Sequence, residues 1–107
     1  MIKIKFTPET LKLEVTGHAN HGKKGEDIVC AAISTLFYTL GEVLNCSRDM
    51  LEEEPIFKDS KGKGILSCKP KEEYNANIVL SYRAILIGME LVANNYPKNV
   101  TFNVVGG

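Results

Sequence analysis

The sequence has 107 residues, of which 44% are hydrophobic and 24% charged, and this fits one globular domain spanning 1–107. Lysine plus arginine and aspartate plus glutamate number 13 each, so the formal net charge is zero. Nucleic-acid-binding proteins usually carry a basic surplus, so no direct nucleic-acid binding is expected. The sequence does not exclude a local basic patch on the surface.

The cysteines and the N-terminal segment indicate the compartment. Cys30, Cys46 and Cys68 are odd in number and form no CxxC pair, so they do not make a disulfide framework. The first residues, MIKIKFTPET, lack the apolar core and cleavage site of a signal peptide. No uninterrupted apolar run reaches the roughly 18 residues of a transmembrane helix. We therefore expect a cytoplasmic protein with free thiols and no membrane partner.

The first half of the chain predicts a hairpin followed by a long helix. Residues 2–6 (IKIKF) and 11–15 (LKLEV) alternate apolar and charged side chains, as half-buried strands do. Residues 17–26 form a glycine-containing loop. Asp27 is a good N-cap for the apolar segment 28–45, whose hydrophobic residues recur at helical spacing.

The second half predicts two short strands at 52–57 and 62–69, a helix that begins within 71–77 and ends before Pro97, and a strand at 100–105. The order ββαββαβ indicates an α+β fold with a mainly antiparallel sheet and two packed helices. Both helices are apolar over much of their surface, which is compatible with burial in a dimer.

Cys30 is the first candidate for chemistry. If Asp27 caps the helix, Cys30 lies in its first turn, where unpaired backbone amides create a partial positive charge. Cysteines in such positions often have lowered pKa values, and the same amides are natural donors to an oxyanion. We therefore expect Cys30 to be partly activated by backbone geometry.

His18 is the candidate proton carrier. Twelve residues separate it from Cys30, enough for the loop to fold back over the helix start. His18 would take the thiol proton and later donate it to a leaving amine. Gly22 and Gly25 suit a loop that bends or admits an extended substrate. Ser34 lies one helical turn after Cys30 on the same face.

Other interpretations stay open. Free cysteine is commonly a small buried hydrophobe, and Cys46 and Cys68 are interpreted as structural. His18, His21 and Cys30 are all potential zinc ligands, but a fourth is not obvious, so no metal site is predicted. The run 52–54 (EEE) could attract a basic partner, although a solvated charge run is the simpler account.

The motif around these residues is similar to that of a known family. GHA at 17–19, then Gly22 and Gly25, then DIVCAA at 27–32 followed by Ser34, resembles the ribosomal-processing cysteine protease Prp family. The resemblance implies that Cys30 is the nucleophile and His18 its partner. It also implies supporting roles for Gly17, Asp27 and Ser34. We interpret His21 as a loop residue that contacts the substrate.

The resemblance further implies a function. The family consists of cytoplasmic, homodimeric endopeptidases of Gram-positive-type bacteria and their relatives. They remove a short N-terminal extension from the large-subunit ribosomal protein numbered twenty-seven during ribosome assembly. No cofactor is expected. Lys23-Lys24 stand where the family often carries acidic or aromatic residues, a departure that bears on substrate preference.

Two hypotheses therefore compete. In the first, the protein hydrolyses peptide bonds through a thioester on Cys30. In the second, it is a non-catalytic ribosome-associated module that binds a peptide, and Cys30 only packs. Rapid alkylation of Cys30 relative to Cys46 and Cys68 would favour the first hypothesis.

Overall fold

A computed structural model describes residues 1–17 and 24–106, with only the backbone described for 24–27. Its strands are β1 (Ile2–Thr7), β2 (Lys12–Thr16), β3 (Ile56–Ser60), β4 (Lys63–Ser67) and β5 (Val100–Val104). Its helices are α1 (Lys24–Cys46) and α2 (Asn75–Asn95), with short 3-10 turns at Pro8–Thr10, Arg48–Met50 and Glu72–Tyr74. The predicted ββαββαβ order is confirmed.

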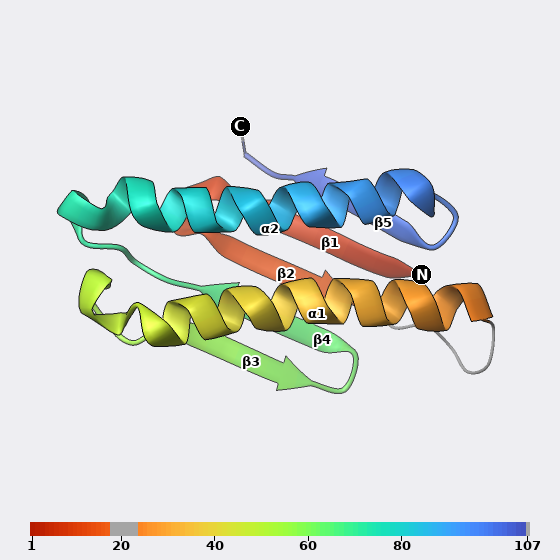
Figure 1. Ribbon diagram of the computed structural model, residues 1–107, viewed down its shortest axis with the longest axis horizontal. Coiled ribbons are helices and arrows are strands. Elements are labelled where there is room, and N and C mark those ends of the chain that lie inside the picture. The colour runs from red at the N-terminus through yellow and green to blue at the C-terminus, as the bar shows by residue number, and fades with distance from the viewer. Residues whose placement is uncertain (18–23, 107) are drawn as a thin grey trace.

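The strands form one sheet in the order β3-β4-β2-β1-β5 (Figure 1). β1–β2, β2–β4 and β3–β4 are antiparallel, and β1–β5 is parallel. The predicted first hairpin is present, with Phe6 opposite Leu13. The expectation of a mainly antiparallel α+β sheet is therefore confirmed.

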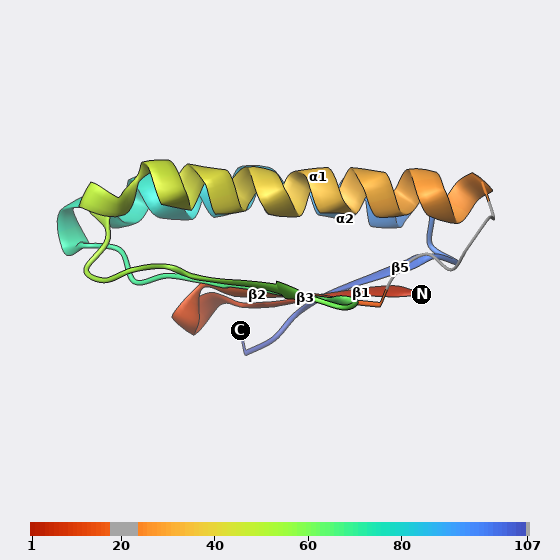
Figure 2. The same cartoon turned by 90° about the horizontal axis from the view of Figure 1, so that it is seen from below.

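Both helices lie side by side on the same face of the sheet, and within the described chain no helix covers the other face, which we call the open face (Figure 2). Alternation along each strand explains this arrangement, because every second side chain points to the helix layer. Ile2, Ile4 and Phe6 of β1 are buried, whereas Lys3 and Lys5 are exposed. Helix residues that complete the core are Val29, Ile33, Phe37, Leu40 and Leu44 of α1 and Ile78, Tyr82, Ile85 and Met89 of α2.

The start of α1 differs from the prediction. The helix begins at Lys24, so Asp27 lies inside it, not at its N-cap, and Gly25 belongs to the helix and not to the loop. The cap preference of aspartate is only a local bias. Lysine and glutamate on either side of Gly25 are good helix formers, so the helix includes this glycine although glycine costs about 1 kcal/mol relative to alanine. Cys30 is consequently beyond the first turn, and the amides left unpaired at the helix start belong to earlier residues.

The second hairpin is tighter than predicted. β3 begins at Ile56, after the acidic run and Pro55, and continues through Ser60. The turn is Lys61-Gly62, in which Gly62 has a φ of 74° and so uses a conformation that favours glycine. The polar KDSK segment concealed the strand because β3 is an exposed edge strand along its whole length. Cys68 directly follows β4 and is not part of it.

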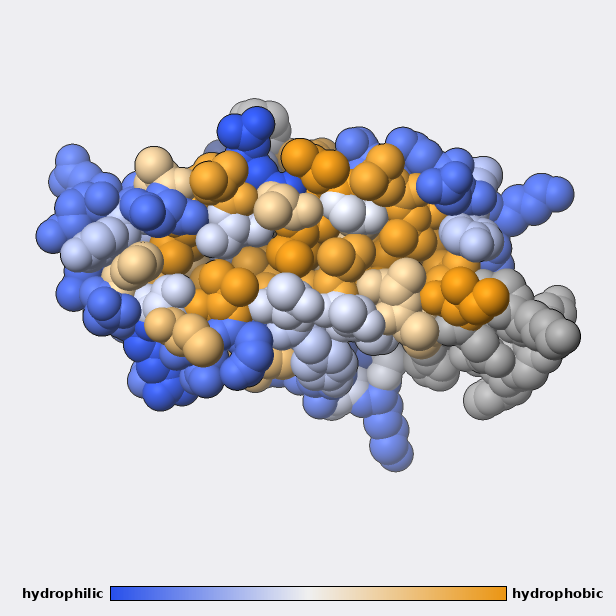
Figure 3. All heavy atoms as spheres, in the orientation of Figure 1, coloured by the Kyte–Doolittle hydropathy of each residue, from blue (hydrophilic) through white to orange (hydrophobic). Residues whose placement is uncertain are grey.

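The outer surface of the helix layer is unusually apolar (Figure 3). Leu80, Ile87 and Leu91 of α2 are 63%, 54% and 58% exposed and recur at helical spacing. The spans Ile28–Cys46 and Glu72–Asn95 are long and apolar enough to cross a membrane by length and composition. Sequence runs alone did not indicate this, because single polar residues interrupt both segments. In this fold each helix already buries one face against the sheet, as core helices do.

Candidate active site

Cys30 opens onto a cavity of about 200 Å³ at one end of the sheet. The cavity lies where α1 passes over the ends of β2 and β4. It is lined from the helix by Cys30, Ser34, Phe37 and Tyr38, and from the strands and their turn by Val15, Gly17, Asp59, Gly62, Lys63 and Gly64. Chain segments far apart in sequence therefore meet beside this thiol.

The Cys30 side chain is half-buried, so it is packed yet reachable from the cavity. Its Sγ lies 4.0 Å from the Oγ of Ser34, at the limit of a sulfur hydrogen bond. Helical spacing places Ser34 four residues on, over the same face of α1. The predicted proximity of these two side chains is observed, and Ser34 is able to orient the thiol.

A layer of aromatic rings supports the floor of the cavity. Phe37 is buried, and its ring lies edge-on to those of Tyr38 and Phe57 at centroid distances of 5.9 and 5.7 Å. Gly64 of β4 faces this ring so closely that a Cβ there would lie 2.6 Å from Phe37 Cζ. Glycine at residue 64 thus lets the helix approach the sheet, and this approach sets the depth of the cavity.

Gly17 closes β2 at the edge of the same cavity. Its φ of 85° favours glycine, and a Cβ would overlap the carbonyl oxygen of Met1. Its N–H donates to the carbonyl of Gly62 at 2.8 Å. Gly17 therefore follows the end of β2 at the cavity that Cys30 also lines, in a conformation and at a close contact that require glycine.

The other motif residues divide into two groups. His18, His21 and Gly22 lie outside the described residues, as do Ala19 and Lys23. Gly25 and Asp27 belong to the backbone of α1. The structure therefore brings Cys30, Ser34 and Gly17 together.

Sequence reasoning missed the strand side of the cavity. Asp59, Lys63 and Gly64 line it from the β3–β4 hairpin, more than 20 residues after Cys30 in the sequence. The one available signal was the GKG string at 62–64, because glycines next to a tight turn often mark a close approach of two backbones.

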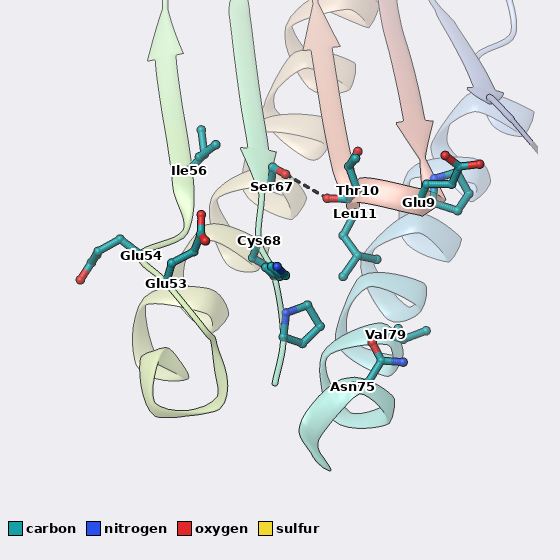
Figure 4. A pocket seen from close by; sticks show the side chains of 13 residues that line it. Glu9, Thr10, Leu11, Glu53, Glu54, Ile56, Ser67, Cys68, Asn75 and Val79 are labelled. Carbon is teal, nitrogen blue, oxygen red and sulfur yellow. Dashed lines mark hydrogen bonds between the residues drawn. The ribbon is translucent and has the colours of Figure 1, made fainter. Parts of the chain in front are cut away.

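A second, larger cavity of about 520 Å³ lies at the opposite end of the sheet, where β1 turns into β2 and β4 ends (Figure 4). Leu11 and Val79 form part of its apolar wall, and Glu53 and Glu54 lie on the other side. Ser67 donates a hydrogen bond of 2.9 Å to the carbonyl of Thr10 across it. This cavity also contains a cysteine, Cys68, so volume alone does not identify the reactive end.

The surroundings of Cys68 indicate a structural role. Burial raises the pKa of the Cys68 thiol, and this disfavours the thiolate that a nucleophile needs. The thiol accepts a hydrogen bond from the buried Tyr82 hydroxyl at 3.7 Å, and burial raises the pKa of that hydroxyl as well. Cys46 is exposed at the C-terminal end of α1.

Metal binding finds no support among the described side chains, because no three His, Cys, Asp or Glu residues there gather closely enough to hold an ion. The zinc alternative requires His18 and His21, which lie outside that part of the chain. Among the described residues of this cavity, Cys30 is therefore the chemically informative group.

Sequence comparison finds one family over nearly the whole chain. A family described as "Cysteine protease Prp" matches residues 1–101. A Mycoplasma genitalium protein named ribosomal processing cysteine protease Prp is 31% identical over 103 residues, covering 96% of this chain and 95% of the relative. A Staphylococcus aureus protein of the same name is 28% identical over 87 residues, covering 81% and 79%.

Structural comparison agrees with the sequence. The crystal structure of the S. aureus ribosomal processing protease with a covalently linked product peptide gives a TM-score of 0.73 at 23% identity, covering 97% of this chain and 99% of that one. A Streptococcus mutans protein gives 0.71 at 28% identity, covering 96% and 90%. The α+β fold of this chain is thus shared with these proteins.

Proposed function

The chain belongs to the cysteine protease Prp family, and from that premise we propose that it is an endopeptidase with Cys30 as nucleophile and His18 as proton carrier. One observation supports the pairing above all. Gly17 and Cys30 line the same cavity, and His18 is the residue bonded to Gly17. The covalent bond to Gly17, a residue of the cavity wall, is the reason that we assign His18 and not His21 to Cys30.

In the proposed reaction, His18 accepts the proton of the Cys30 thiol as Sγ bonds to the carbonyl carbon of the scissile peptide. The C–N bond then breaks, and His18 donates that proton to the leaving amine, which leaves a thioester on Cys30. Water, deprotonated by His18, attacks the thioester and releases the acid product and the free thiol. No cofactor takes part.

The corrected helix start changes the activation argument. Because α1 begins at Lys24, the amides around Cys30 are internal to the helix and cannot serve as free oxyanion donors. We therefore assign activation of Cys30 chiefly to His18, with Ser34 as a positioning residue. Asp27 retains a supporting assignment, and His21 and Gly22 retain the assignment to the substrate loop, whereas Gly25 belongs to α1.

The proposed substrate is the N-terminal extension of the large-subunit ribosomal protein numbered twenty-seven, cleaved in the cytoplasm during ribosome assembly. Curated relatives carry the words ribosomal processing in their names, and related S. aureus structures hold a substrate or a product peptide. Val15, Phe37 and Tyr38 around the cavity favour an apolar substrate residue beside the cleaved bond.

The same proposal includes a homodimer. The apolar stripe Leu80, Ile87 and Leu91 is the surface we assign to a second copy, because a monomer rarely exposes a continuous apolar patch of this kind. Ile87→Asp should shift the mass measured by light scattering from two chains to one. Ile56→Asp is the matched control, since Ile56 is 47% exposed and lies on the β3 edge; equal masses for both variants and wild type would contradict this interface.

Incubation with the full-length precursor tests the enzyme itself. Wild type, Cys46→Ala and Cys68→Ala should remove the extension at similar rates, and Cys30→Ala should bind the precursor and leave it intact. Cleavage by Cys30→Ala would refute the mechanism. Binding by wild type without any cleavage would instead favour the peptide-binding module.

A further inference from the structure

The open face of the sheet is strongly and unevenly charged. Both helices cover one side of the sheet (Figure 2). Strand alternation and register determine which side chains lie on the opposite side. In the described strands, the charged members of that set are Lys3, Lys5, Lys12, Lys58, Lys63 and Glu14. The described part of this face thus carries five lysines and one carboxylate, in a chain whose formal net charge is zero.

The register shows that these charges share one continuous surface. One row crosses the five strands as Lys58, Ile65, Glu14, Lys5 and Asn103. The neighbouring row crosses them as Ser60, Lys63, Thr16, Lys3 and Thr101. With strands about 4.8 Å apart, the surface is roughly 19 Å wide.

Glu14, the one carboxylate that the described strands place on this face, lies among several lysines. Lys12 Nζ lies 2.9 Å from Glu14 Oε1, and the Glu14 side chain is only 18% exposed. The hydrogen bond from Lys12 lowers the pKa of Glu14, and the charges of Lys12, Lys5 and Lys63 lower it further. One glutamate neutralises the charge of one lysine, so most of the positive charge on this face is available to a partner.

The chemistry of the uncharged members favours phosphate as that partner. Thr16, Ser60, Thr101 and Asn103 supply short hydroxyl and amide groups between the lysines, the types that bind phosphate oxygens. A hollow of about 370 Å³ lies among β1, β2 and β5 on this face. Within the described strands the face has no aromatic side chain, whereas protein interfaces favour aromatic anchors.

We propose that the open face of the sheet binds a structured RNA through its phosphate backbone. Lysines spread over four of the five strands suit a duplex stem, because the described strands place on this face no aromatic ring on which unpaired bases would stack. The choice of RNA rests on the proposed function, because a protease of ribosomal proteins meets its substrate close to ribosomal RNA. The helix layer remains free for a second copy.

Fluorescence anisotropy with a labelled RNA hairpin, measured against KCl concentration, tests this surface. Wild type and Cys30→Ala should bind equally, with an affinity that falls steeply as salt rises. Lys3→Gln/Lys5→Gln should bind about tenfold more weakly, with a log–log salt slope smaller by about 2. Lys69→Gln/Lys98→Gln removes the same charge from outside this face and should bind like wild type.

Several results would overturn the proposal: no binding at about 50 mM KCl, equal losses in both double variants, or tighter binding to poly-glutamate than to the hairpin. The last result would assign the face to an acidic protein. Peptide cleavage by the same samples separates the two proposals, because Lys3→Gln/Lys5→Gln should cleave a short peptide at the wild-type rate. Failure of cleavage in wild type would count against the protease and not against the RNA surface.

Discussion

The two ends of the sheet each contain a cavity and a half-buried cysteine, yet they differ in what surrounds the thiol. At one end, Cys68 lies in the larger cavity, but a buried tyrosine hydroxyl donates to its sulfur and burial raises its pKa. At the other end, Cys30 lies in the smaller cavity, next to Ser34 and to the glycine that precedes His18. The difference teaches that the chemical surroundings of a thiol, and not the volume beside it, identify the candidate nucleophile.

The largest expected effect separates the two histidines that follow Gly17. His18→Ala should lower kcat/KM by about 10³-fold or more, because the proton carrier of the Cys30 end is lost. His21→Ala should lower it less than about tenfold. Steady-state cleavage of one peptide by both variants makes the measurement, and circular dichroism checks that both remain folded. Equal losses would remove the special role of His18.

The next effect concerns the packing that forms the smaller cavity. Gly64→Ala should lower the free energy of unfolding by about 1–3 kcal/mol, because the new methyl group meets the Phe37 ring. Ser67→Ala at the larger cavity should cost less than about 1 kcal/mol, since it removes one exposed hydrogen bond to Thr10. Urea unfolding of the two variants compares the ends, and a larger loss for Ser67→Ala would contradict the assigned packing.

A smaller contrast compares the hydroxyl beside each thiol. Tyr82→Phe should lower the free energy of unfolding by about 1 kcal/mol, through the lost hydrogen bond to Cys68, and leave cleavage within about twofold. Ser34→Ala should do the reverse, lowering kcat several-fold at nearly unchanged stability. Rescue of kcat by Ser34→Thr would support positioning of Cys30. If Tyr82→Phe lost more activity than Ser34→Ala, the catalytic thiol would have to be assigned to Cys68 and not to Cys30.

The smallest effect belongs to the open face between the ends. The pKa of Glu14 is lowered in the folded state, so its ion pair stabilises the fold above the ordinary carboxyl pKa of about 4.3. That contribution is lost as pH falls through the lowered pKa. Glu14→Gln should therefore flatten the pH dependence of unfolding below about pH 5, by less than about 1 kcal/mol. An unchanged pH profile would show that Lys12 and Glu14 do not interact in solution.

Much of the fold followed from the sequence because its strands alternate cleanly. Lys3 and Lys5 between buried apolar neighbours predict β1, and the turn with Pro8 predicts the hairpin. The start of α1 did not follow, because Asp27 is a good cap by local chemistry and still lies within the helix. Caps express local preference, and helix length is decided together with packing on the sheet.

The candidate site was predictable only on its helix side. Cys30 and Ser34 are four residues apart, so helical periodicity alone places them on one face. Gly64 meets Val15 at the cavity through the register of β2 with β4, and no local sequence pattern specifies long-range pairing of this kind. The contrast between Cys30 and Cys68 also depends on tertiary burial, which the sequence represents only as two similar apolar neighbourhoods.

Time-resolved alkylation of the wild-type protein by iodoacetamide near neutral pH tests the central claim most directly, with peptide mapping of all three cysteines and cleavage measured on the same samples. The account predicts that Cys30 is modified well before Cys46 and Cys68, and that activity falls in proportion to Cys30 modification alone. Full activity after Cys30 is completely modified, or activity that falls with Cys68 instead, would contradict it.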